Sequence, residues 1–146
     1  MKIKVKLDKG AKIPTRAHGT DAGLDIYARE DQLVPAKGSA KFDTGVHIEL
    51  PYLDIMGELY CTVGMLKSKS GLNVKHGITS EGVIDMGYTG SIMVKLYNHS
   101  DTDYMVKAGD KISQLVIFPI INPTPCLVDS LDDAERGDNG FGSSGR

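Results

Sequence analysis

The hydrophobic positions of the chain follow a period of two in short runs, which is the pattern of half-buried β-strands. In residues 2–7, Lys-Ile-Lys-Val-Lys-Leu, charged and apolar side chains alternate strictly, so we expect one solvated and one buried face. No stretch keeps a period of three to four residues, and prolines follow the last long apolar run. Further strands are expected, between glycine, proline and polar residues, at 21–28, 32–35, 39–50, 104–106, 111–118 and 126–128.

Many short strands separated by turns predict an all-β fold, a distorted jelly-roll-like barrel or sandwich. The segment Tyr52–Met65 fits neither period, and we expect it to be irregular apart from a strand near Leu59–Leu66. The last residues are acidic and then rich in glycine and serine, a composition that cannot build a core of its own. The predicted organisation is therefore one β domain at 1–128 and a flexible glycine-rich arm at 129–146.

The sequence Gly-Val-Ile-Asp-Met-Gly-Tyr-Thr-Gly at 82–90 places one carboxylate, Asp85, between two apolar runs. Gly87 and Gly90 permit positive φ in a tight connection, so we expect a β-hairpin that carries Asp85 and Tyr88. Its two paired strands would be built from Val83, Ile84, Ile92, Val94 and Leu96. An alternative is that Asp85 only accepts hydrogen bonds from its own turn, as aspartates beside glycines commonly do.

Length, charge and cysteine content narrow the possible functions. With 146 residues, 40% of them hydrophobic and 25% charged, the chain has material for one domain. A formal net charge of -2 disfavours a polymeric nucleic acid partner, because such a partner needs a basic face. Cys61 and Cys126 lack the spacing of a zinc site, and no apolar stretch is long enough to span a bilayer. We expect no membrane association and a cytoplasmic location, or the interior of a host cell if the protein is virus-encoded.

Two stretches combine groups that bind phosphate. Residues 67–72, Lys-Ser-Lys-Ser-Gly-Leu, join lysines, hydroxyls and a glycine in an expected loop. Residues 136–145 place an arginine and a phenylalanine among glycines and serines. Each could equally be a solvated loop or a flexible terminus, and neither has the spacing of a Walker P-loop. Gln114, inside an apolar strand, could simply satisfy a buried backbone group.

Short motifs along nearly the whole chain resemble those of the trimeric deoxyuridine triphosphatase (dUTPase) family. Any one of them alone would be weak evidence, but their common order at compatible spacing is specific. In chain order they are Ala22-Gly23-Leu24-Asp25, Lys69-Ser70-Gly71-Leu72, Gly82-Val83-Ile84-Asp85 with Tyr88 and Gly90, Gly109-Asp110-Lys111-Ile112-Ser113-Gln114-Leu115, and Arg136-Gly137 with Gly140-Phe141-Gly142-Ser143.

The resemblance implies a homotrimer in which each active site takes residues from all three subunits. It implies hydrolysis of dUTP to dUMP and pyrophosphate with Mg2+, which lowers dUTP and supplies the dTTP precursor dUMP. Asp85 would orient and deprotonate the water that attacks the α-phosphorus. Tyr88 would pack beneath the deoxyribose and leave no space for a 2′-hydroxyl group.

Other site residues are implied in the same way. Asp25 would support Mg2+ through water, while phosphate oxygens and water hold the ion. The phosphates would be held by Lys69, Ser70, Gly71 and Gln114. The uracil would be recognised by the backbone of Gly82, Val83 and Ile84. The arm would close over a neighbouring subunit's site as a lid, with Arg136 and Ser143 at the phosphates, Phe141 over the uracil, and Gly142 as a further substrate-binding residue.

The chain departs from the family pattern at several places. Lys69 stands where arginine is usual, Gly87 where an acidic residue is usual, and Tyr52–Thr62 is longer than usual. One alternative function is a nucleotide-gated regulatory protein that uses the same site and engages a protein partner through Tyr52–Thr62. A second is a relative of the dCTP deaminases, in which Glu81 would be the catalytic carboxylate.

Overall fold

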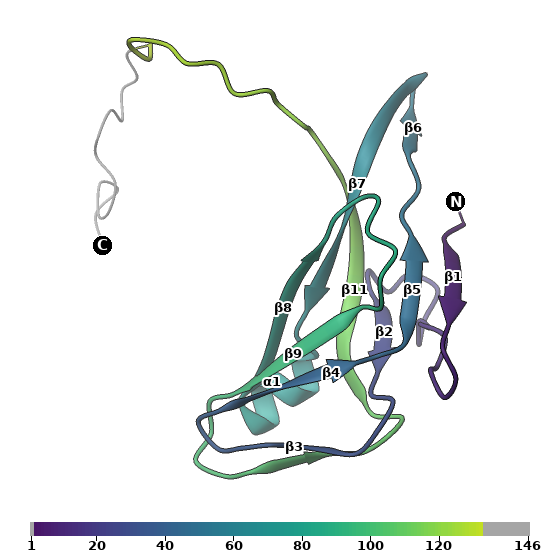
Figure 1. The fold of residues 1–146 in the computed structure, drawn as a ribbon, viewed down its shortest axis with the longest axis vertical. Coiled ribbons are helices and arrows are strands. Elements are labelled where there is room, and N and C mark those ends of the chain that lie inside the picture. The colour runs from purple at the N-terminus through teal and green to yellow at the C-terminus, as the bar shows by residue number, and fades with distance from the viewer. Residues whose placement is uncertain (1, 133–146) are drawn as a thin grey trace.

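Most of the strands expected from the alternation of side chains are present in a computed structural model, which describes residues 2–132 (Figure 1). Within this range the chain forms β-strands and one short helix. Their bounds are β1 Lys4–Leu7, β2 Leu24–Tyr27, β3 Gln32–Val34, β4 Ser39–Asp43, β5 Val46–Glu49, β6 Leu53–Ile55, β7 Glu58–Lys67, α1 Ser70–His76, β8 Ile78–Ile84, β9 Met93–Asn98, β10 Tyr104–Val106 and β11 Lys111–Ile120.

One curled antiparallel sheet forms the body of the molecule, with strands in the order β2, β11, β7, β8, β9 and β4, and with β6 added to β7. Two small ribbons, β1 with β5 and β3 with β10, lie beside it (Figure 1). The prediction of an all-β, jelly-roll-like fold is confirmed. A single apolar core lies between these layers, and its largest fully buried side chains include Phe42, Ile26, Leu66, Ile78, Ile92, Leu96, Ile112 and Leu115.

The helix α1 corrects the prediction that 67–72 is a loop. Ser70–His76 forms seven residues of α-helix, which ends at Gly77 in the left-handed region with a φ of 65°. The Gly77 N–H donates to the Asn73 carbonyl at 2.9 Å, which is a common way to end a helix. None of the helical residues is buried, so the sequence carries no amphipathic period from which this helix could be read.

A second correction concerns Tyr52–Met65: the strand expected near Leu59–Leu66 is present as β7, but the rest of the segment, which we expected to be irregular, is ordered as well. β6 and β7 instead form a regular antiparallel hairpin, with Leu53 opposite Tyr60 and Ile55 opposite Glu58. Met56 and Gly57 form its two-residue turn, with φ values of 55° and 89°. Positive φ at both positions matches the right-handed twist of the flanking strands.

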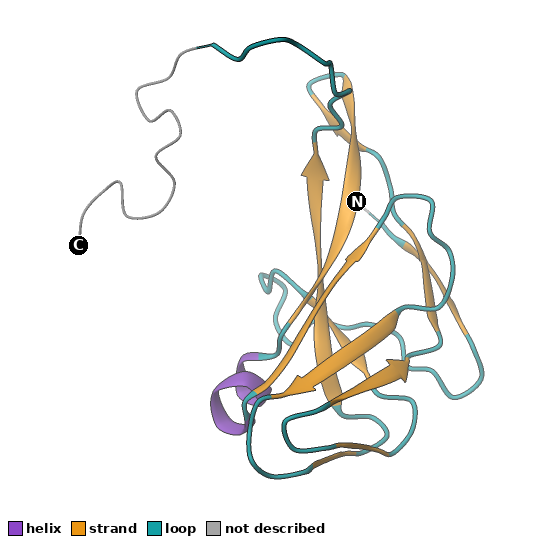
Figure 2. Cartoon of the chain, turned by 60° about the vertical axis from the view of Figure 1, so that its left-hand side comes forward, coloured by secondary structure: helices purple, strands orange, loops and turns teal. Residues whose placement is uncertain are grey.

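The chain leaves the sheet after β11, and the strand expected at Cys126–Val128 is absent. Residues 121–132 contain no strand, and they run away from the body of the molecule (Figures 1 and 2). The apolar side chains of Ile121 and Leu127 are 83% and 100% exposed. A strand needs a neighbour for its backbone hydrogen bonds, and no described strand lies beside this segment.

No helix within residues 2–132 has the length and apolar character to cross a bilayer.

We predict that Gly57→Ala lowers the free energy of unfolding by about 1 kcal/mol, the cost of placing a side chain in the left-handed region. An added methyl group at Gly57 meets no atom within 4 Å, so any loss of stability comes from backbone strain and not from a steric clash. Gly19→Ala is the matched control, because its site is equally open and its φ is ordinary. Urea denaturation of both variants measures the effect; equal stability of the two would contradict the assigned turn.

Candidate active site

A buried carboxylate between two lysines lies in the sheet. Asp25, in β2, is 5% exposed; its Oδ1 accepts a hydrogen bond from Lys69 Nζ at 2.6 Å, and its Oδ2 lies 2.7 Å from Lys111 Nζ. Burial by itself would raise the pKa of Asp25, but the hydrogen bonds from Lys111 and Lys69 outweigh it and hold this pKa below its ordinary value. The three side chains together carry one excess positive charge, which suits them to binding an anion.

Lys111 is a site candidate that sequence reasoning missed, because its approach to Asp25 depends on an irregularity in β11. The register between β11 and β2 shifts between Lys111 and Ser113, so that Lys111 lies opposite Tyr27 while Gln114 lies opposite Asp25. In a regular strand, positions 111 and 114 would point to opposite faces. A bulge removes that constraint, and no feature of the sequence marks where it occurs.

Gln114 lies in a row of residues that crosses four strands. It is the register partner of Asp25 in β2 and of Lys67 in β7, and Lys67 is in turn the partner of Glu81 in β8. The Gln114 side chain donates from Nε2 to the carbonyl of Ser68 at 3.0 Å. The predicted phosphate-binding residue therefore lies beside the end of β7, where the chain turns towards α1.

The predicted phosphate-binding residues 69–71 lie just after this row. Lys69 precedes α1 as its N-cap residue and reaches Asp25 with its side chain. Ser70 and Gly71 form the exposed start of α1, and an added methyl group at Gly71 would meet no atom within 4 Å. The structure thus brings Lys69, Ser70 and Gly71 together with Asp25 and Gln114.

The prediction of a β-hairpin around 82–90 is only partly correct, because the two strands pair over a shorter length than we expected. β8 and β9 pair only through 78–80 and 96–98. Beyond that point Gly82–Ile84 pairs with β7, and Met93–Lys95 pairs with β4. Because each strand follows its other partner, the two strands separate and leave facing backbone edges without a ladder between them. We call this opening the fork; a pocket of about 210 Å³ at the fork is lined by Val83, Ile84, Asp85, Tyr88 and Met93.

Asp85 and Tyr88 lie on the connection from β8 to β9. The Tyr88 N–H donates to the Asp85 carbonyl at 3.1 Å, and Gly87 between them has a φ of 92°, as the third residue of a type II turn requires. The Asp85 side chain is exposed, and its carboxylate accepts no hydrogen bond from residues 2–132. The alternative was that Asp85 only accepts hydrogen bonds from its own turn. Its backbone carbonyl does accept such a bond, but its carboxylate does not.

Tyr88 folds back over its own connection. The residue is 45% exposed, and its hydroxyl donates to the Ser91 carbonyl at 2.9 Å. Gly90 lies directly under the ring, since a Cβ built there would lie 2.6 Å from Tyr88 Cζ. A glycine at position 90 is therefore required for this placement of the aromatic face.

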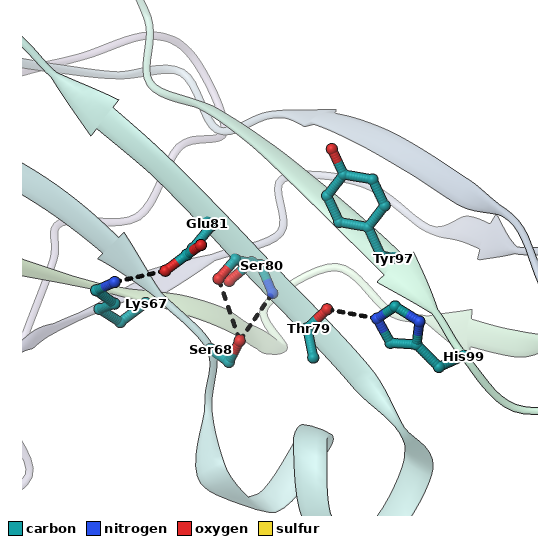
Figure 3. Close-up of a pocket in the computed structure, with 7 residues that line it drawn as sticks. All are labelled: Lys67, Ser68, Thr79, Ser80, Glu81, Tyr97 and His99. Carbon is teal, nitrogen blue, oxygen red and sulfur yellow. Dashed lines mark hydrogen bonds and ion pairs between the residues drawn. The ribbon is translucent and has the colours of Figure 1, made fainter. Parts of the chain in front are cut away.

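A larger pocket of about 580 Å³ opens beside the row described above (Figure 3). Lys67 Nζ donates to Glu81 Oε1 at 2.5 Å, and this hydrogen bond lowers the pKa of Glu81. Thr79 Oγ1 lies 2.9 Å from His99 Nε2 on the same surface. The carboxylate that a deaminase mechanism would use is thus already engaged by a lysine. The lining residues are Lys67, Ser68, Thr79, Ser80, Glu81, Tyr97 and His99.

The described residues do not form a metal site on their own. Within residues 2–132, no three His, Cys, Asp or Glu side chains are grouped so that they could hold an ion. Both carboxylate oxygens of Asp25 face lysine ammonium groups. Mg2+ commonly combines one or two carboxylates with phosphate oxygens and water, so these residues fit an ion that is bound mainly by a phosphorylated ligand.

The remaining predicted site residues lie outside the described part of the chain. These are Arg136, Phe141, Gly142 and Ser143. Their roles stay predictions.

The fold and the site together define a class of protein: a jelly-roll-like β protein that presents an anion-binding cluster and, separately, an exposed carboxylate at a small pocket. The dUTPase family model matches residues 9–145, and the chain belongs to this family.

Individual relatives agree with this assignment. A Schizosaccharomyces pombe protein named probable deoxyuridine 5'-triphosphate nucleotidohydrolase is 43% identical over 141 residues, which cover 96% of this chain and 95% of that protein. The dUTPase of Staphylococcus bacteriophage 80alpha, solved with dUpNHpp, matches with a TM-score of 0.87 and 31% identity over 99% of both chains. A dUTPase from phage phi11 of S. aureus, described with a structural Mg(II) ion, matches with a TM-score of 0.78 and 27% identity over 91% of this chain and 100% of that one.

We predict that Asp25→Asn lowers the free energy of unfolding at neutral pH, because it leaves Lys69 and Lys111 without their counter-charge. Folding lowers the pKa of the Asp25 carboxyl, so its charge stabilises the protein fully at pH values above its pKa in the unfolded chain, 3.8. This stabilisation is lost as the pH falls through the lower pKa of the folded protein. The difference between wild type and variant should therefore stay constant near neutrality and shrink only in acid. Urea denaturation across this pH range measures it.

The control is Asp101→Asn, because Asp101 forms an exposed ion pair with Lys37. Such a pair contributes little, so this variant should match the wild type. A difference for Asp25→Asn that does not change in acid would show that the charge of Asp25 is not its source.

Proposed function

We propose that this protein hydrolyses dUTP to dUMP and pyrophosphate. The observation that carries the proposal is the fork between β8 and β9 with the exposed Asp85 carboxylate at its mouth, in a chain that belongs to the dUTPase family. The names of its relatives support the substrate, since the Schizosaccharomyces pombe protein is named for the hydrolysis of deoxyuridine triphosphate. The 80alpha dUTPase was solved with dUpNHpp, an analogue of that nucleotide.

The fork suits the recognition of a uracil ring. The facing edges of Gly82–Ile84 and Met93–Lys95 are not paired with each other, so their backbone groups can bond to a ligand. Uracil presents an acceptor, a donor and an acceptor in order, whereas cytosine changes that order. A site that hydrogen-bonds one order leaves buried groups unpaired with the other, which penalises the wrong base strongly.

The sugar and phosphates would extend from the fork past Tyr88. The exposed face of the Tyr88 ring would pack against the deoxyribose and exclude a 2′-hydroxyl group. Lysine ammonium, hydroxyl and backbone N–H groups at 69–71, with Gln114, would hold the triphosphate. Mg2+ would be bound by the phosphate oxygens and water near Asp25, and would neutralise their charge.

Asp85 would act as the base. In-line displacement at the α-phosphorus needs one positioned water, and a carboxylate within hydrogen-bond distance can orient that water and accept its proton. The carboxylate of Asp85 is suited to this role because it is exposed and is not engaged by other described residues. The arm, with Arg136, Phe141, Gly142 and Ser143, would cover the bound nucleotide and exclude other water.

The two halves of the site are too far apart in one chain, which supports a homotrimer with shared sites. Asp85, the first residue after β8, follows Glu81 by four positions, a distance of roughly 13 Å at the rise of an extended strand. Glu81 lies in the same row as Lys67 and Gln114, and Lys69 lies beyond Lys67 in the direction away from Asp85. A water on Asp85 would therefore attack a phosphate that is held by another subunit.

We predict that the wild type releases pyrophosphate from dUTP with Mg2+, but not from UTP, dCTP or dTTP, and that Asp85→Asn slows release by about 100- to 10,000-fold, the usual contribution of a general base. Glu81→Gln is the matched carboxylate control and should keep the activity. Pyrophosphate and ammonia are measured in the same reactions. Ammonia release from dCTP, or full activity of Asp85→Asn, would contradict the proposal.

Shared sites predict complementation between inactive chains. Asp85→Asn and Lys69→Met chains, co-expressed with different tags and purified as mixed oligomers, should regain part of the wild-type rate, because some sites then receive both native residues. Asp85→Asn mixed with Asp85→Ala is the control and should regain none. Failure of the first pair in verified mixed oligomers would place the complete site within one chain.

A further inference from the structure

The connection 85–92, which carries Asp85 and Tyr88, is fixed by hydrogen bonds at its C-terminal end. Ser91 Oγ donates to Asp43 Oδ1 at 2.5 Å, and the Ile92 N–H donates to the Val46 carbonyl at 2.8 Å. These bonds fix the last two residues of the connection to β4 and β5. They leave the middle of the connection to be held by other groups.

His47, in β5, provides such a contact. Its Nδ1 lies 2.8 Å from the carbonyl oxygen of Thr89, and its Nε2 lies 3.2 Å from Asp8 Oδ2. The His47 side chain is 19% exposed, and Nε2 is shielded from solvent and makes no hydrogen bond within residues 2–132, so the Asp8 carboxylate acts on it as a close opposite charge. The imidazole thus bridges the turn after β1 and the connection that carries the proposed base.

The chemistry of the two partners decides the protonation of the ring. The Thr89 carbonyl oxygen can only accept a hydrogen bond, so Nδ1 must carry a proton; a lone pair on Nε2 would face the ionised Asp8 carboxylate, and this repulsion favours a proton there as well. A neutral imidazole has one N–H and can satisfy only one of them. The geometry around His47 therefore fits the doubly protonated imidazolium.

The surrounding charges have opposing effects. The Thr89 carbonyl and then the Asp8 carboxylate raise the pKa of His47, while burial and Lys6, its cross-strand neighbour, act to lower it; the net direction is upward. Arg29 Nη1 lies 3.8 Å from Asp8 Oδ2 and shares that carboxylate with His47. Lys4, the next lysine along β1, pairs with Glu49 at 2.8 Å, so its charge is balanced.

We propose that His47, in its doubly protonated form, is a positioning residue that holds Thr89, and through it the Asp85–Tyr88 turn, in the geometry that binds dUTP. This inference rests on the proposed function. His47 does not line the pocket at the fork, so its effect passes through the backbone of the connection. Loss of its proton frees either Thr89 or Asp8 and loosens the turn.

The direction of the pH dependence follows. Because folding raises the pKa of His47 above 6.5, the contact is complete below that value and is lost as the pH rises through the higher folded value. We expect the kcat/KM of the wild type, divided by that of His47→Gln at the same pH, to fall by about three- to tenfold between about pH 6 and about pH 9. The change should lie mainly in KM, since the fork and Tyr88 contact the ground-state nucleotide.

Two further variants sharpen the test. His47→Lys keeps a permanent charge over this range, so its ratio to His47→Gln should stay flat. His18→Gln is the matched control, because His18 also pairs with a carboxylate, Asp21, at 3.5 Å but is exposed and touches no part of the connection. Its pH profile should follow the wild type. A wild-type ratio that stays flat, or a His18→Gln profile that flattens, would overturn the proposal.

A spectroscopic measurement separates this inference from the proposed activity. In 15N NMR spectra of the full-length protein, both His47 nitrogens should carry protons at about pH 6, and the Gly90 amide resonance should titrate together with the ring. In His47→Gln that amide should not titrate in this range. A His47 ring that is neutral at this pH, or a Gly90 amide that does not follow it, would overturn the inference even in an active enzyme. If the wild type hydrolyses no dUTP, the proposed function fails while the spectra still decide whether His47 holds the connection.

Discussion

The structure depends on the point at which β8 leaves β9. A strand can pair along both edges, but from Gly82 onward β8 follows β7 while the facing part of β9 follows β4. This separation opens the fork, exposes backbone groups that a base can use, and carries Asp85 to the mouth of the opening. If the two strands paired to their ends, the hairpin would be regular and would leave no room for a ligand between them.

The same arrangement separates the carboxylate that would act on water from the cations that would hold phosphate. The register places the Asp25 cluster roughly 13 Å or more from Asp85 along the sheet. Within one chain, the carboxylate of Asp85 is therefore too far from Lys69 and Lys111 to form an ion pair with them. Asp25 instead holds Lys69 and Lys111, which makes a buried carboxylate tolerable and fixes both ammonium groups in place.

The connection between β8 and β9 has to be flexible enough to turn and rigid enough to aim two side chains. Gly87 permits the turn through its positive φ, whereas Ser91 and Ile92 attach the far end to the core strands. His47 adds a contact at Thr89 whose strength varies with pH. The geometry of the proposed active site therefore depends on polar groups that lie behind it, on β4, β5 and the turn after β1.

The sequence by itself determined the all-β class, most strand positions and the residues proposed for the site, because alternation of side chains and short motifs are local properties. It did not reveal α1 or the β6–β7 hairpin, since an unburied helix and an exposed hairpin show no clear period. The roles of Lys111 and His47, and the fork, depend on a bulge, on strand register and on contacts between distant segments. Only the tertiary structure decides such features, because the energies that select them come from pairing and burial between residues far apart in the chain.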